Sequence, residues 1–139
     1  AGRVRDFSVQ GLANTAWAFA TSGHAAPSLL DAIAAEAVRR VREFNSQELS
    51  NTAWAYATTG NWAPELLEVI SAEAVGRVRE FTPQALSVTV WAFATARHKA
   101  PALHDAIAVE AAQRVREFNP QELSNTAWAF ATAGHAADA

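Results

Sequence analysis

The chain contains no cysteine and no methionine, and it has only five prolines and six glycines among 139 residues. The absence of cysteine excludes a disulfide framework, a zinc site of the CxxC type and a thiol nucleophile. The scarcity of proline and glycine excludes collagen-like and low-complexity disordered chains. No run of 18 apolar residues is present, so the sequence predicts no membrane insertion. A formal charge of −3 argues against a strongly basic nucleic-acid arm.

A period of 37 residues organises what is present. Valine, phenylalanine and tryptophan recur at this spacing, and the first two full units share 23 of 37 residues. The units cover 4–40, 41–77, 78–114 and, in part, 115–139, and residues 1–3 match the tail of a preceding unit. Both ends cut through a repeat, so we expect a longer array. The tryptophan row consists of Trp17, Trp54, Trp91 and Trp128.

Each unit carries the start and stop signals of two helices. In the second unit, Asn45 is the expected N-cap, Glu48 completes a capping box, and Phe44 with Leu49 forms a hydrophobic staple. The first helix is therefore predicted from about Ser46 to Thr58, ending before Gly60. The second helix is predicted to begin at Pro27, Pro64 or Pro101 and to run to about Glu43, Glu80 or Glu117.

Tandem pairs of antiparallel helices define the fold class, which we predict to be an all-α α-solenoid. A helix pair cannot bury its apolar side alone, so neighbouring units must supply the rest of the core. We expect the tryptophan row to fill this core between units, and the flanking alanines, among 34 in the chain, to permit close helix approach.

The sequence predicts no enzyme, because it lacks the GxSxG, HExxH, Walker and GxGxxG motifs. His24, His98 and His135 share one repeat position, which places neighbouring imidazoles roughly 10 Å apart, too far to share a metal. His104 is read as a partly buried, satisfied histidine. We therefore predict no catalytic residue, cofactor, metal or small-molecule substrate.

Eight of the eleven basic residues fall into two rows at one end of the helices. Such rows can follow a phosphate backbone, so they are candidate RNA phosphate contacts. They can equally be salt-bridge rows, because one row follows a glutamate by four residues and the other adjoins acidic residues. The first row is Arg3, Arg40, Arg77 and Arg114, and the second row is Arg5, Arg42, Arg79 and Arg116.

A polar row lies in the middle of the first helices. Asparagine is a poor residue for a helix interior, so a contact should offset its cost. The amides either bond between stacked units or contact RNA bases. The row is Asn14, Asn51, Val88 and Asn125, in which valine replaces the amide once.

Positions that differ between units lie on one face of the second helix, represented by Ser28, Ala32, Ala35 and Arg39. That face is either solvent-exposed or a selective protein-binding surface. Trp62, in a loop, is a candidate protein-contact residue.

The segment 44–57, with its relatives at 81–94 and 118–131, resembles the signature helix of octotricopeptide repeats, whose phrase is close to F-x-P-Q-E-L-x-N-x-x-W-A. The resemblance implies two antiparallel helices per repeat. It further implies a chloroplast or mitochondrial setting, where most members act on organelle RNA and some are structural subunits of large assemblies.

Two hypotheses follow. The first is a non-enzymatic organelle RNA-binding array, in which single-stranded RNA lies along the stacked helices. The second is a protein-interaction scaffold or accessory subunit of a large organelle complex. If RNA is the ligand, Arg40, Arg42, Arg77 and Arg79 should be exposed and free of close carboxylate partners.

Overall fold

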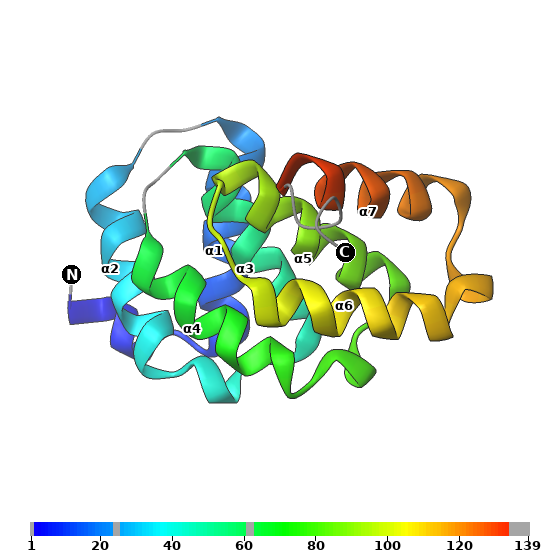
Figure 1. Ribbon diagram of the computed structural model, residues 1–139. Coiled ribbons are helices and arrows are strands. Elements are labelled where there is room, and N and C mark those ends of the chain that lie inside the picture. Colours follow the sequence, from blue (N-terminus) through cyan, green and yellow to red (C-terminus); the bar gives the residue numbers. More distant parts are fainter. Residues whose placement is uncertain (1, 24–25, 61–62, 134–139) are drawn as a thin grey trace.

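The computed structural model describes residues 2–23, 26–60 and 63–133. Within these ranges the chain forms α-helices and short 3₁₀ turns and no strand, which confirms the all-α fold class. The helices are stacked side by side, as an α-solenoid requires (Figure 1). In chain order the elements are η1 (Gly2–Asp6), α1 (Val9–Ser22), α2 (Pro27–Arg39), η2 (Val41–Glu43), α3 (Ser46–Thr59), α4 (Pro64–Val75), η3 (Val78–Glu80), α5 (Pro83–Ala96), α6 (Pro101–Gln113), η4 (Val115–Glu117) and α7 (Pro120–Ala133).

The helices form two layers. The first helices of the units, α1, α3, α5 and α7, pack on one another, and the second helices, α2, α4 and α6, form the other layer. Neighbouring first helices pack much more closely than neighbouring second helices. Small buried side chains such as Ala53, Ala55 and Ala92 permit this approach, as the sequence predicts.

The core between the layers consists of aromatic and branched aliphatic side chains. Phe44 and Phe81, which precede α3 and α5, are buried, as are Leu49 and Ile70. The buried Tyr56 hydroxyl donates a 2.6 Å hydrogen bond to the Leu30 carbonyl and so ties α3 to α2. Burial, with the charge of Asp31 as a smaller cause, raises the pKa of Tyr56 above its ordinary value.

The prediction that the tryptophan row fills the core is wrong for Trp17 and Trp128, whereas Trp54 and Trp91 pack against the core without being buried in it. Trp17 is 46% exposed and Trp128 is 48% exposed, and Trp54 and Trp91 are only partly buried. Small side chains such as Ser50, Thr52 and Ala53 are buried elsewhere on the same helix as Trp54, where an indole would prevent close packing. The row therefore lines a surface of the first-helix layer.

The local signals at the helix ends are confirmed. Asn45 and Glu48 form the reciprocal capping box, with both hydrogen bonds at 2.8 Å. Gly60 ends α3 in the left-handed conformation at φ 72°. Arg97, which replaces this glycine in the third unit, adopts the same conformation at φ 57°.

The second helices are shorter than predicted. α2 ends at Arg39, and Arg40 leaves the helical conformation at φ −119° before the separate turn η2. The link to the next first helix is short, so the chain has to change direction here rather than continue to Glu43. Among the described helices, none combines the length and apolarity needed to span a bilayer.

Candidate functional site

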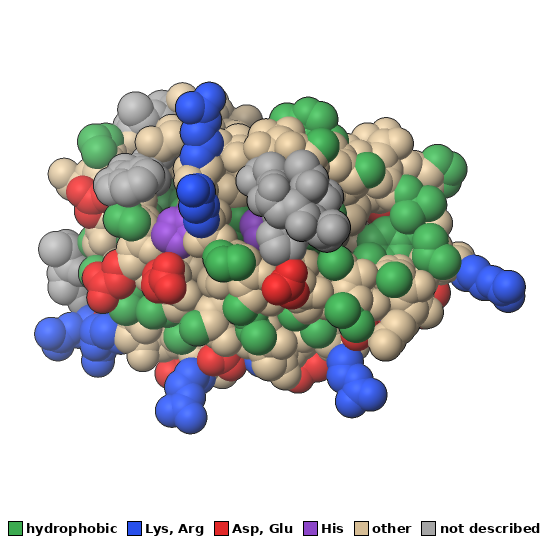
Figure 2. Space-filling view, in the orientation of Figure 1, with side chains coloured by type: hydrophobic (Ala, Val, Ile, Leu, Met, Phe, Trp, Pro, Cys, Tyr) green, Lys and Arg blue, Asp and Glu red, His purple; other side chains and the backbone are tan. Residues whose placement is uncertain are grey.

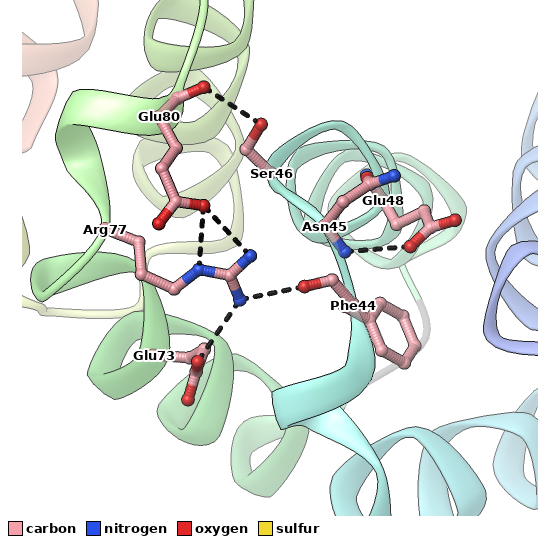
Figure 3. Close-up of polar contacts among 7 residues, drawn as sticks. All are labelled: Phe44, Asn45, Ser46, Glu48, Glu73, Arg77 and Glu80. Carbon is pink, nitrogen blue, oxygen red and sulfur yellow. Dashed lines mark hydrogen bonds and ion pairs between the residues drawn. The ribbon is translucent and has the colours of Figure 1, made fainter.

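The two arginine rows have different environments. In the first row, Arg77 lies at the end of α4 with only 20% of its side chain exposed. Its Nη1 donates to the Phe44 carbonyl at 2.8 Å, and its guanidinium also binds Glu73 and Glu80, each at 3.2 Å (Figure 3). Phe44 precedes α3 and Arg77 follows α4, so this contact joins the two ends of one helix pair. We call it the arginine clamp.

The clamp recurs in the neighbouring units. Arg40 donates to the Phe7 carbonyl at 2.7 Å, and Arg114 donates to the Phe81 carbonyl at the same distance. Each also pairs with two glutamates, which are Glu36 and Glu43 for Arg40 and Glu110 and Glu117 for Arg114.

The spacing of the glutamates in the helices and in the short 3₁₀ turns explains why they all bind the first arginine row. The residue four before the arginine lies one helical turn away, as with Glu36 and Arg40. In a 3₁₀ turn, side chains three residues apart eclipse each other, which places Glu43 over Arg40 rather than beside Arg42. Arg40 and Arg77 therefore do not meet the condition set for RNA contacts, and the salt-bridge alternative holds for these two residues.

The second row is free, which is the condition set for RNA contacts at Arg42 and Arg79. Arg5, Arg42, Arg79 and Arg116 are exposed, and within the described ranges none forms an ion pair or a hydrogen bond. Basic side chains project from the left, lower and right margins of the molecule in Figure 2, where Figure 1 places the 3₁₀ turns. We call these four residues the arginine edge. The side chain of Arg3 lies outside the described residues.

At Arg5, the arginine edge lies on the second-helix side of the stack. Arg5 lines an open hollow on α2 together with Ala32, Ala35 and Arg39. Ala32, Ala35 and Arg39 belong to the face of the second helix that differs between units. This part of the arginine edge is therefore continuous with that face.

The asparagine row does not bond between units. In α3, Gln47 donates a 3.0 Å hydrogen bond from its amide nitrogen to Asn51 Oδ1. Gln121 and Asn125 repeat this contact in α7, also at 3.0 Å. In the described part of the chain, no amide of this row bonds to the next unit, so the row is not an inter-repeat hydrogen-bond ladder. Asn14 is exposed, and Asn51, Val88 and Asn125 are partly buried.

The glutamine partners form a row that the sequence reasoning missed. They recur with the same 37-residue period, always four residues before the asparagine row, and all four are exposed. The signal was therefore present in the sequence. The row is Gln10, Gln47, Gln84 and Gln121.

The described histidines make local contacts. His98 Nε2 lies 3.1 Å from a carboxylate oxygen of Glu68 and its ring packs edge-on against Phe93. The His104 ring is buried, with Nδ1 2.9 Å from the Ala100 carbonyl. Over the described ranges, no group of three acidic or histidine side chains could hold a metal ion. His24, His135 and Trp62 lie outside the described residues.

These features define a class: a helical-repeat protein whose stacked helices carry a free cationic edge and an uncharged surface of amide and aromatic side chains. A comparison with protein families places the chain within one. The model of the family described as RNA-editing substrate-binding complex 6 protein matches residues 2–136, and the chain belongs to this family. No curated protein matches the chain.

Proposed function

We propose that this protein is a non-enzymatic RNA-binding array of the octotricopeptide type, acting in an organelle on single-stranded RNA. The family's name refers to binding the substrate of RNA editing, which supports a role on RNA within a larger complex. The resemblance of the first helices to octotricopeptide repeats supports the same role and an organelle, mitochondrion or chloroplast, as its place.

The observation that carries the proposal is the separation of the two arginine rows. The clamp commits its glutamates to its own guanidinium, at distances of 3.2 Å around Arg77. The arginine edge therefore keeps its donors free, at one exposed guanidinium per unit. Guanidinium groups bind phosphate oxygens through charge-assisted, often bidentate hydrogen bonds. We assign the phosphate contacts to Arg5, Arg42, Arg79 and Arg116 and the base contacts to the asparagine row.

The test is the salt dependence of binding to a fluorescently labelled single-stranded oligouridylate. Four phosphate contacts predict that the affinity falls with a log–log slope of about −3, since each contact on a single strand contributes about 0.7. The double variant Arg42→Ala, Arg79→Ala should weaken binding and reduce the slope by about 1.4.

A charge-matched control is available at the other end of the helices, where Arg97 and Lys99 are exposed. The double variant Arg97→Gly, Lys99→Ala removes the same charge and gives the third unit the glycine found at Gly23 and Gly60. It should bind RNA with an unchanged slope. Equal slopes for the edge variant and the wild type would reject the phosphate assignment. No measurable RNA binding by the wild type would reject the RNA role and favour the protein-scaffold hypothesis.

A further inference from the structure

The outer face of the first-helix layer carries the same four side chains in almost every unit. In α3 these are Gln47, Asn51, Trp54 and Thr58, spaced so that they lie on one side of the helix. The equivalent residues in the other units keep the glutamine, the tryptophan and the threonine without exception. We call this surface the amide–tryptophan face: Gln10, Asn14, Trp17, Thr21, Gln47, Asn51, Trp54, Thr58, Gln84, Val88, Trp91, Thr95, Gln121, Asn125, Trp128 and Thr132.

None of these sixteen side chains is buried. The glutamines and threonines are exposed, and the tryptophans at the two ends of the row are about half exposed. None carries a charge, whereas the solvent face of a helix normally carries lysine, arginine and glutamate. Exposed indoles repeated across a layer of helices indicate a binding surface rather than a solvated one.

The amides on this face are oriented but not saturated. Gln47 uses one amide hydrogen to bind Asn51 Oδ1, at 3.0 Å. An amide side chain offers two donor hydrogens and a carbonyl with two lone pairs. The Asn51 amino group and the Gln47 carbonyl oxygen make no hydrogen bond within the described part of the chain. Paired donors and acceptors of this kind suit the edges of unpaired bases.

The indoles supply stacking surface beside the amides. The rings of Trp17 and Trp54 lie with their centroids 6.3 Å apart and their planes tilted by 34°, so the first two units bring their aromatic rings together. Aromatic rings next to hydrogen-bonding groups are the typical platform for single-stranded nucleic acid, because every base has a face that can stack.

We propose that the amide–tryptophan face contacts the bases of single-stranded RNA, with indoles stacking on bases and asparagine–glutamine pairs bonding base edges. This inference rests on the proposed RNA-binding function. A surface that repeats once per unit matches a polymer with a repeating unit, whereas a protein partner without repeats offers no matching period. Asn51 lies about 9 Å along the axis from the N-cap of α3, at the end where the arginine edge lies.

The third unit makes the inference specific. Val88 replaces the asparagine there, so Gln84 has no amide partner at this position and the base-edge contact is lost. The second and third units therefore differ naturally at this position, with Asn51 in one and Val88 in the other. Asn51→Val should weaken binding and Val88→Asn should strengthen it, each by about fivefold, the effect of one hydrogen bond.

The decisive experiment uses two oligomers of equal length and charge, an oligouridylate and the same ribose–phosphate backbone without bases. The variant Trp17→Ala, Trp128→Ala changes the two most exposed indoles of the face, and Val109→Ala, at a side chain 59% exposed on α6, is the control. Circular dichroism verifies that each variant is folded. Loss of one stacked base contact lowers affinity at least about fivefold per ring.

The inference expects the tryptophan variant to lose oligouridylate affinity, to bind the baseless oligomer like the wild type, and to keep its salt slope. Oligouridylate affinity equal to that of the wild type, or equal losses on both oligomers, would overturn it while RNA binding itself stands. If the wild type binds neither oligomer, the proposed function fails, and the base-contact inference fails with it.

Discussion

Two arginines that stand two residues apart should behave in opposite ways when they are replaced. Arg77 closes the clamp of the second unit, and Arg79 belongs to the arginine edge. Replacing Arg77 with alanine removes the 2.8 Å hydrogen bond to the Phe44 carbonyl and the 3.2 Å pairs with Glu73 and Glu80. It leaves a buried carbonyl acceptor and two neighbouring carboxylates without their cation.

The magnitude follows from the environment of the clamp. A hydrogen bond to a charged group contributes about 1.5–3 kcal/mol, and the pair with Glu73 is shielded because both side chains are less than a quarter exposed. The pair with Glu80 contributes little, since that side chain is 59% exposed. We expect Arg77→Ala to lower the free energy of unfolding by about 2–3 kcal/mol. Arg79→Ala should change it by no more than about 0.5 kcal/mol.

Urea unfolding followed by far-UV circular dichroism measures both values. The variant Arg77→Lys is the control for geometry, because lysine keeps the charge but cannot reach Phe44, Glu73 and Glu80 with one planar group. Its stability should fall between those of the wild type and the alanine variant. Equal stabilities for Arg77→Ala and Arg79→Ala would refute the division of the arginines into clamp and edge.

Three further predictions concern the core, the caps and the tyrosine. Phe44→Ala should lower the free energy of unfolding by about 3–5 kcal/mol, because Phe44 is only 2% exposed. Trp17→Ala should lower it by less than about 1 kcal/mol. Similar losses for the two variants in urea unfolding would contradict the placement of the tryptophan row. Asn45→Ala should cost about 1 kcal/mol through loss of the capping box, measured against the exposed control Gln47→Ala. Tyr56 is the only tyrosine, and burial raises its pKa in the folded protein above the ordinary value of about 10. Its contribution to stability is therefore present below about pH 10 and is lost as the pH rises above it. Ultraviolet titration should therefore show no tyrosinate until the chain unfolds, and a normal titration curve in the folded protein would be inconsistent with burial.

Local signals in the sequence predicted the framework well. Asn45 and Glu48 form the predicted capping box, and Gly60 ends α3, because caps depend on residues within one turn of each other. The helix pairs follow directly from the repeat. Their stacking also follows, since a unit of this size needs its neighbours to complete a core.

The 37-residue period could not show whether the tryptophan row faces the core or the surface. Along α3, Leu49, Ala53 and Tyr56 are spaced in the same way as Gln47, Asn51 and Trp54, but the two sets are offset by two residues, about 200° around the helix. Both patterns are helical stripes, and the larger hydrophobe suggested the core. The structure buries the other stripe, whose Tyr56 reaches the second-helix layer and bonds the Leu30 carbonyl of α2.

The placement of the charges changes what a net charge of −3 means for binding. Each clamp holds one guanidinium between two carboxylates, so the three described clamps together carry the same charge as the whole chain. Arg42, Arg79 and Arg116 of the edge therefore each stand two residues from a clamp of opposite sign. The opposite charges of an edge arginine and its neighbouring clamp offset each other at a distance. Beyond about 10 Å, the screening length at 0.1 M salt, both are also largely screened. On the proposed function, the edge attracts a phosphate only at contact range, so the arginines alone would provide weak, salt-dependent binding. The base contacts proposed for the amide–tryptophan face would then be needed to keep RNA bound at physiological salt.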